Sequence, residues 1–98
     1  EAIVGEEAVA SLEKYNFTKG FWGTNGITRE RGFSTPEVKE AMVKQKSMQN
    51  CKQRYVLADT SKFNQISSVT FAPFESAQII TTGLGQTAFK KCKNVIQI

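Results

Sequence analysis

The sequence predicts an α/β fold with a mostly parallel sheet, because segments of helical and of strand character alternate along the chain. Two predicted strands are each followed at once by glycine or by small polar residues, as occurs where parallel strands of a sheet end in a binding site. The 98 residues are 40 % hydrophobic and 22 % charged, which suits one globular domain. We therefore expect a Rossmann-like sheet flanked by helices.

The first elements are predicted from periodicity and turn signals. Residues 3–15 carry apolar side chains at helical spacing and are predicted to form a helix that ends at Asn16. Residues 18–22 are aromatic and β-favouring, which indicates a strand. Residues 23–35 are expected to be a loop, since Asn25-Gly26 and Gly32 are turn signals.

The next predicted helix begins near residue 35 and ends at about Asn50. Ser34 or Thr35 is expected to cap it, and Ser34 with Glu37 matches the Ser-x-x-Glu capping box. Pro36 suits the first turn, where a missing N–H costs nothing. Its apolar stripe is expected to comprise Val38, Ala41, Met42 and Met48.

The second half contains one strand that is apolar almost throughout and several shorter elements. Residues 54–58 are predicted to form this strand, buried in a parallel sheet. The other predictions are a helical turn at 62–66, strands at 69–72, 78–81 and 95–98, and a last helix at 84–93.

Composition excludes several classes of function. The chain has no histidine and only two cysteines, which argues against a zinc site and rules out a histidine-dependent triad. The cysteines are expected to be free thiols in a reducing compartment, so a cytoplasmic location is expected. The net charge of +4 arises from residues 51–98, where a short lysine cluster at 90–93 does not resemble a nucleic-acid-binding surface. No apolar run reaches the roughly 20 residues of a membrane helix.

Two polar motifs follow predicted strands. Gly23-Thr24-Asn25-Gly26 could hold an anion on exposed backbone N–H groups, although Asn-Gly also occurs in plain turns. In the second motif, Ala58-Asp59-Thr60-Ser61-Lys62, the carboxylate could accept a hydroxyl hydrogen bond and the lysine could bind a phosphate. The alternative is that Asp59 or Thr60 caps a helical turn and Lys62 is solvated.

Glu40 and Lys44 lie four residues apart on one face of the predicted helix. They could point at the loop after the first strand, or form a surface ion pair worth only about 0.3–0.5 kcal/mol. Trp22 and Phe33 are interpreted as core or rim residues, because large aromatic side chains dominate burial.

In this order and spacing, the motifs resemble the C-terminal sensor domain of the DeoR family of bacterial transcriptional repressors. The resemblance covers about residues 5–82. Within the family, the chain is similar to the subgroup of lactose phosphotransferase system and fructose repressors. The segments that carry it are Phe21-Trp22-Gly23-Thr24-Asn25-Gly26-Ile27, Gly32-Phe33-Ser34-Thr35-Pro36, Glu40-Ala41-Met42-Val43-Lys44 and Val56-Leu57-Ala58-Asp59-Thr60-Ser61-Lys62-Phe63.

The resemblance implies a fold related to ribose-5-phosphate isomerase and a role in repressing genes of sugar uptake and catabolism. Residues 1–98 would be the C-terminal portion of the sensor, without the first half of that domain and without the DNA-binding winged helix-turn-helix. A phosphorylated sugar, of the tagatose 6-phosphate or fructose 1-phosphate type, would release the repressor from operator DNA. A homo-oligomer is expected, with no cofactor and no membrane association.

The resemblance also implies the effector-binding residues of this chain. They are expected to be Gly23, Thr24, Asn25, Gly26, Glu40, Lys44, Asp59 and Lys62. The isomerase likeness leaves a sugar-phosphate aldose–ketose isomerase as the alternative function, and a bare assembly module as another. A non-enzymatic role is expected, because Thr24-Asn25 stand where the isomerase has acidic residues, and proton abstraction needs a placed base.

Overall fold

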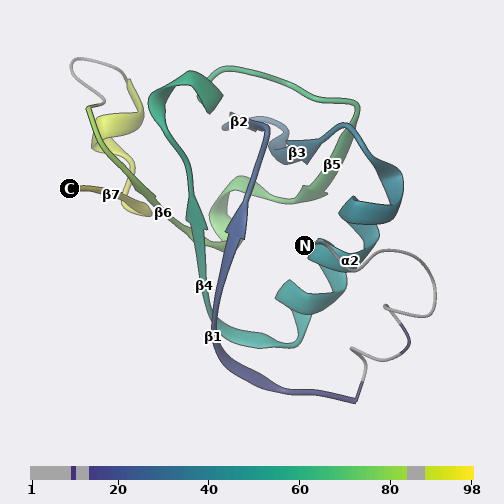
Figure 1. The fold of residues 1–98 in the computed structure, drawn as a ribbon. Helices are drawn as coiled ribbons and strands as arrows, with labels where there is room; N and C mark the ends of the chain where they lie inside the picture. Colours follow the sequence, from purple (N-terminus) through teal and green to yellow (C-terminus); the bar gives the residue numbers. More distant parts are fainter. Residues whose placement is uncertain (1–9, 11–13, 84–87) are drawn as a thin grey trace.

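The computed structural model describes residues 10, 14–83 and 88–98, and these contain two sheets and one longer helix. Strands β1 (Phe17–Gly23), β4 (Cys51–Leu57), β6 (Gln78–Thr81) and β7 (Val95–Gln97) form a four-stranded sheet in the order β1-β4-β6-β7. All three strand pairs in this sheet are parallel. The α/β fold with a mostly parallel sheet is therefore confirmed (Figure 1).

Residues 23–35, which were expected to be a loop, contain two strands of a second, antiparallel sheet. Strands β2 (Gly26–Thr28), β3 (Gly32–Thr35) and β5 (Val69–Ala72) form it in that order. The turn signals mark the ends of the β2–β3 hairpin rather than an irregular loop, and Gly32 adopts the positive φ of 78° that the turn requires. Ile27 and Phe33 pair across the hairpin and are fully buried, so tertiary packing stabilises strands too short for a clear sequence signal.

Helix α2 (Val38–Gln49) packs against β4 of the parallel sheet and against β3 and β5 of the smaller sheet. In Figure 1 it lies beside β1 and β4, below the smaller sheet. The helix ends at the C-cap Asn50, as predicted, but it begins later than expected. Glu37 is the N-cap, and its carboxylate accepts a hydrogen bond of 3.2 Å from the backbone N–H of Lys39.

The predicted capping box is therefore wrong, because Ser34 and Thr35 belong to strand β3 and their side chains are buried. Pro36 precedes the helix rather than lying in its first turn. The apolar stripe is also narrower than predicted. Ala41 and Met48 are buried, whereas Val38 and Met42 are exposed, because only the side of the helix that faces the sheets is covered.

The remaining described helical segments are short 3-10 turns. They are η1 (Thr60–Lys62), η2 (Phe74–Ser76) and η3 (Ala88–Lys91). The helical turn predicted at 62–66 is wrong beyond Lys62, because the turn is η1 at Thr60–Lys62, where Asp59 provides a cap, and Phe63 forms a β-bridge. Of the helix predicted at 84–93, residues 88–91 form η3 and residues 92–93 are not helical. Residues 84–87 lie outside the described residues, as does almost all of the helix predicted at 3–15.

The core lies between the two sheets and α2 and is largely aromatic. Phe33 stacks near Phe71 and Phe74, with ring centroids 6.2 and 6.3 Å apart. Phe89 extends this group: its ring centroid lies 5.9 Å from that of Phe74, and 4.7 Å from that of Phe63 in an edge-to-face contact. These side chains are all buried, so Phe33 is a core residue, as predicted. Trp22 is half-buried, and its indole N–H donates a 2.9 Å hydrogen bond to Ser47 Oγ on α2.

Only one face of the parallel sheet is buried in this core. Val56 on β4 and Ile79 on β6 point into it, whereas their neighbours Leu57 and Ile80 point to the other face, together with Phe21. Leu57 is 48 % exposed and Phe21 57 % exposed. The prediction of a strand buried on both faces is therefore wrong for β4, because no described element covers the second face.

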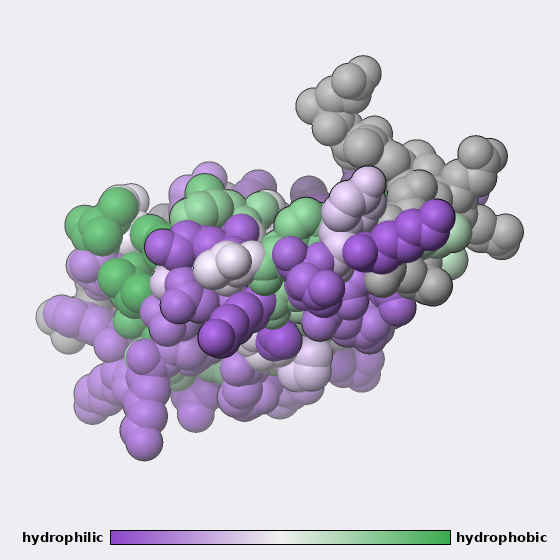
Figure 2. Space-filling view, turned by 90° about the horizontal axis from the view of Figure 1, so that it is seen from below, coloured by the Kyte–Doolittle hydropathy of each residue, from purple (hydrophilic) through white to green (hydrophobic). Residues whose placement is uncertain are grey.

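Hydrophilic side chains dominate the surface shown in Figure 2, and hydrophobic ones gather at the end of the molecule that carries β6 and β7. Ile96 and Ile98 in this region are 38 % and 78 % exposed. None of the helices in the described part of the chain has the length and apolar character needed to cross a bilayer.

Candidate functional site

The candidate site lies at the carboxyl ends of strands β1 and β4. These strands are adjacent and parallel, and their last residues, Gly23 and Leu57, are partners in the register. The Gly23–Gly26 segment and the Asp59–Lys62 segment consequently start at the same edge of the sheet. Ligands of open parallel sheets bind at this edge, so its position agrees with the sequence interpretation.

The two segments are also joined further along the chain. Ile27 in β2 forms a parallel bridge with Phe63, and the backbone N–H of Asn64 donates a 2.8 Å hydrogen bond to the Ile27 carbonyl. Asn64 adopts a φ of 63°, a conformation that asparagine tolerates better than most residues. This bridge fixes the chain after η1 against the smaller sheet.

Lys44 reaches from α2 to the end of β1. Its Nζ donates a 2.9 Å hydrogen bond to the Gly23 carbonyl and lies 5.2 Å from the centroid of the Phe71 ring. Burial lowers the pKa of Lys44 below its ordinary value of 10.5, and the negative charge of Glu40 opposes this shift. The site thus contains a half-buried cation that is close to a carboxylate.

Thr35 connects the first motif with α2. Its side chain is fully buried, and its hydroxyl lies 3.4 Å from Asn25 Oδ1 and 3.5 Å from Glu40 Oε2. Sequence reasoning missed Thr35 as a site residue, because Ser/Thr before a proline at a predicted helix start is normally interpreted as a cap. The side chains of Asn25, Glu40 and Lys44 therefore gather around the end of β1.

Two residues of the first motif have internal roles. Thr24 is buried, and its hydroxyl lies 2.9 Å from the Gly26 carbonyl and 3.0 Å from the Ser34 carbonyl. A Cβ on Gly26 would overlap the carbonyl oxygen of Gln65 and lie 2.7 Å from Ser34 Oγ, so this glycine permits close packing.

Gly23 differs from Gly26. A Cβ at Gly23 would have no atom within 4 Å, and its φ is not positive. No packing contact with the described residues therefore requires glycine at this position, and the space between them beside Gly23 is open.

Asp59 is a cap, as the alternative interpretation of its motif predicted. Its carboxylate accepts a 2.9 Å hydrogen bond from the backbone N–H of Ser61 and another from the Ser61 hydroxyl. The hydrogen bonds from the Ser61 side chain and backbone, with a smaller contribution from the charge of Lys62, hold the pKa of Asp59 below its ordinary value of 3.8. The Asp59 side chain is thus occupied by its own turn, whereas the Lys62 side chain is partly exposed beside it.

The structure therefore brings four of the eight predicted residues into one group of contacts: Gly23, Asn25, Glu40 and Lys44. Thr24 and Gly26 stabilise the hairpin beneath this group. Asp59 and Lys62 lie on the neighbouring segment at the same edge of the sheet. The described residues contain no group of three or more histidine, cysteine, aspartate or glutamate side chains that could hold a metal ion.

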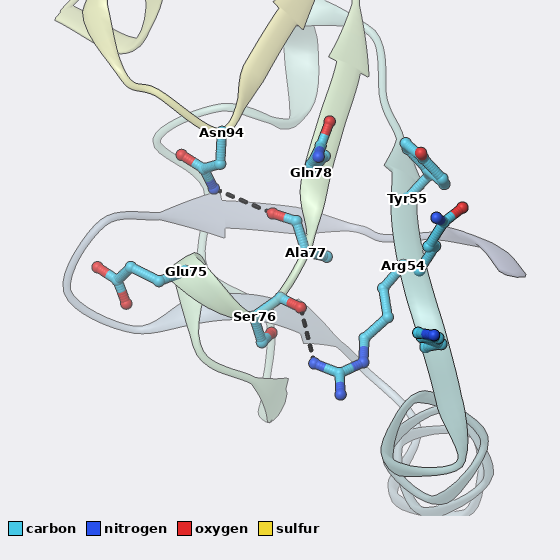
Figure 3. A pocket seen from close by; sticks show the side chains of 9 residues that line it. Arg54, Tyr55, Glu75, Ser76, Ala77, Gln78 and Asn94 are labelled. Carbon is cyan, nitrogen blue, oxygen red and sulfur yellow. Dashed lines mark hydrogen bonds between the residues drawn. The ribbon is translucent and has the colours of Figure 1, made fainter. Parts of the chain in front are cut away.

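A hollow of about 270 Å³ lies at the opposite, amino ends of β4 and β6 (Figure 3). Two of the polar side chains that line it, Arg54 and Asn94, form hydrogen bonds with backbone carbonyls. The Arg54 guanidinium donates to the carbonyls of Met48, Cys51 and Ser76, and the Asn94 amide donates to those of Phe74 and Ala77. Because these groups satisfy backbone carbonyls and lie at the amino ends of the strands, we interpret the hollow as structural.

Comparison with known proteins identifies the family. The family model of the DeoR C-terminal sensor domain matches residues 1–83. The HTH-type transcriptional regulator FruR of Bacillus subtilis (strain 168), itself described as uncharacterized, is 46 % identical over 88 residues, which cover 90 % of this chain and 35 % of FruR. HTH-type transcriptional regulator IolR of the same organism is 35 % identical over 81 residues, covering 83 % of this chain and 32 % of IolR.

A sugar-system repressor is also among the relatives. The lactose phosphotransferase system repressor of Staphylococcus aureus (strain NCTC 8325 / PS 47) is 34 % identical over 71 residues, covering 72 % of this chain and 28 % of the repressor. The chain spans about a third of the length of the relatives that it matches. The chain therefore belongs to the DeoR family, and residues 1–83 match the C-terminal sensor domain of that family.

Proposed function

We propose that this chain is the effector-binding part of a transcriptional repressor of sugar-uptake and catabolic genes, and that a phosphorylated sugar is its effector. The observation that carries the proposal is the convergence of Gly23, Asn25, Glu40 and Lys44 at the carboxyl edge of the sheet, with the Asp59–Lys62 segment beside them. Membership of the DeoR family supports a regulatory rather than a catalytic role, since the curated relatives are transcriptional regulators.

The chemistry of the site suits a ligand with both a phosphate and hydroxyl groups. Lys44 and Lys62 provide positive charge for the phosphate, and the open space beside Gly23 allows the ligand to approach the backbone closely. The amide oxygen of Asn25 and the carboxylate of Glu40 are acceptors for sugar hydroxyl groups. The lactose phosphotransferase system repressor among the relatives supports a sugar-related effector. An effector of the fructose 1-phosphate or tagatose 6-phosphate type is what the family resemblance implies.

Regulation would be allosteric. Operator DNA would be bound by a helix-turn-helix domain outside this chain, as the names of the HTH-type relatives support. A cytoplasmic homo-oligomer stays an expectation. The effector must bind the DNA-released state more tightly than the DNA-bound state, because equal affinity for the two states shifts no equilibrium.

The direct test is a thermal-shift titration of the intact regulator that contains this chain with a panel of phosphorylated sugars. A ligand present at 100 times its Kd adds about 2.7 kcal/mol to the free energy of unfolding, which is readily measured. We expect a shift with one ketose phosphate and none with its unphosphorylated sugar. Lack of any shift across the panel would contradict the proposal, and turnover of a sugar phosphate would favour the isomerase alternative.

The role of Lys62 is tested by Lys62→Ala, with Lys93→Ala as the matched control. Both variants lose one positive charge, but Lys62 follows the carboxyl end of β4, whereas Lys93 precedes β7 at the amino edge of the sheet. We expect Lys62→Ala to weaken effector-induced release from operator DNA at least about tenfold, because hydrogen bonds to charged groups contribute about 1.5–3 kcal/mol. Equal behaviour of the two variants would remove Lys62 from the site.

A further inference from the structure

Thr35 occupies a position that neither packing nor helix capping explains. It lies in β3, directly after Ser34 and before Pro36, and its side chain is fully buried. Its hydroxyl faces two acceptors on different elements, namely Asn25 Oδ1 at 3.4 Å and Glu40 Oε2 at 3.5 Å. A valine would fill the same volume without the hydroxyl, so packing alone does not require threonine here.

One hydroxyl proton cannot satisfy both acceptors at once. Both distances are also longer than the roughly 2.7–2.8 Å of an ordinary O–H···O hydrogen bond, so neither acceptor is fully engaged. Asn25 is exposed and Glu40 is half-buried, so both retain lone pairs that a ligand can reach. The arrangement therefore presents two acceptors side by side, aligned by one buried hydroxyl.

Such a pair recognises hydroxyl groups and rejects phosphate. A carboxylate repels an anionic group, whereas it accepts strong hydrogen bonds from neutral hydroxyls. The cations of the site are separate side chains: Lys44 lies one turn after Glu40 on α2, and Lys62 lies on η1. Phosphate binding and hydroxyl recognition thus fall to different residues.

We propose that Thr35 is a positioning residue, which holds Asn25 and Glu40 as a hydroxyl-reading pair and so determines which phosphorylated sugar the sensor accepts. This inference rests on the proposed function and deepens it. The reason is geometric: selectivity between sugars that differ in one hydroxyl requires acceptors held in fixed positions, and the buried Thr35 is the group that contacts both.

The test compares Thr35→Val with Thr35→Ser in the intact regulator. Calorimetric affinities are measured for fructose 1-phosphate, fructose 6-phosphate, tagatose 1-phosphate and tagatose 6-phosphate, which differ in phosphate position and in the configuration at carbon 4. We expect Thr35→Val to weaken binding of the preferred sugar about tenfold or more and to reduce its preference over the epimer. Thr35→Ser keeps the hydroxyl and is expected to preserve the order of affinities.

The other outcomes contradict either the proposed function or the role of Thr35 alone. If the wild-type protein binds none of the four sugars, the proposed function fails and the inference fails with it. If the wild type binds and discriminates but Thr35→Val weakens all four equally or not at all, only the role of Thr35 is wrong. Absence of discrimination in the wild type would also overturn that role.

A second variant guards against a folding defect in Thr35→Val. Asn25→Ala changes an exposed side chain and removes one acceptor of the pair, so the fold is expected to tolerate it. It should reduce the preference between the epimers in the same way. Retention of the full preference in Asn25→Ala would contradict the hydroxyl-reading pair independently of Thr35.

Discussion

At the scale of single residues, the two glycines of the first motif have different reasons to be glycine. Gly26 is required by packing, because its Cβ would collide with the Gln65 carbonyl. Gly23 has open space around it and no positive φ. A glycine that packing against the described residues does not require, at the carboxyl end of β1, is the position where a ligand can approach the backbone.

This difference gives a first prediction, tested by Gly23→Ala and Gly26→Ala. Gly23→Ala should leave the free energy of unfolding unchanged or raise it by up to about 1 kcal/mol, because alanine restricts the unfolded chain. Gly26→Ala should lower it by about 1–3 kcal/mol, because the added methyl group overpacks a buried site. The thermal shift caused by the effector should fall in Gly23→Ala despite its intact fold. An unchanged shift in Gly23→Ala would show that the ligand does not approach this residue.

A second prediction concerns Asp59 and pH. The pKa of Asp59 is lowered because its carboxylate accepts hydrogen bonds from Ser61, so the ionised cap stabilises the folded state. This contribution is complete above the ordinary value of 3.8 and is lost as the pH falls through the lowered pKa. Asparagine also caps well but does not titrate.

We therefore expect wild type to lose stability relative to Asp59→Asn below about pH 4, and a constant difference between the two above it. Urea unfolding at a series of pH values measures this difference. A constant difference down to pH 2 would mean that the Asp59 carboxylate makes no cap in solution.

At the scale of elements, the start of α2 shows that tertiary packing can override a local sequence pattern. The Ser-x-x-Glu pattern at Ser34 and Glu37 satisfies the rule for a capping box, yet Ser34 lies in β3. Its hydroxyl accepts a 2.9 Å hydrogen bond from the backbone N–H of Ser67 instead. Ser34 therefore anchors the segment before β5, and Glu37 caps the helix.

The third prediction compares Ser34→Ala with Glu37→Ala. Glu37→Ala removes an exposed cap and should cost about 0.5 kcal/mol or slightly more. Ser34→Ala leaves the Ser67 N–H without its partner in a partly buried site and should cost about 1–3 kcal/mol. Amide hydrogen exchange should accelerate at Ser67 in Ser34→Ala and at Lys39 in Glu37→Ala. Faster exchange at the Glu37 amide in Ser34→Ala and at the Ser34 amide in Glu37→Ala would support the capping box instead.

At the scale of the whole molecule, the parallel sheet is covered on one face only by the described residues. Purely parallel sheets normally have helices on both faces. The second face carries Phe21 stacked on Tyr55, with ring centroids 5.3 Å apart, next to the row formed by Leu57, Ile80 and Ile96. This apolar row is continuous across three strands.

The fourth prediction is that the 98-residue chain on its own binds the hydrophobic dye ANS through this face. Phe21→Ser should reduce the dye fluorescence clearly, because Phe21 lies in a contiguous apolar surface. Ile66→Ser is the control, since Ile66 is 64 % exposed but lies outside the sheet. Equal effects of the two substitutions would mean that the face is covered in solution. Sedimentation of the same variants tests the expected homo-oligomer, which stays a prediction.

The sequence by itself determined the elements that have a strong local signal. Periodicity and β-propensity were sufficient for β1, β4, the body of α2 and the short strands β5, β6 and β7, because each contains a run of residues with one consistent preference. The order of polar motifs after strands was sufficient to locate the candidate site at one edge of the sheet. Family resemblance gave eight candidate residues, of which Gly23, Asn25, Glu40 and Lys44 come together in the fold, and their role in effector binding stays a prediction.

Only the tertiary structure decided the rest, because it depends on contacts between residues far apart in sequence. Strands β2 and β3 are three and four residues long, and they form where Ile27 and Phe33 can be buried against Phe63, Phe71 and Phe74. The role of Thr35 arises because β3 places its hydroxyl between a loop residue and a helix residue. Local propensity cannot predict such a position, since the two acceptors that define it, Asn25 and Glu40, come close to each other only in the folded chain.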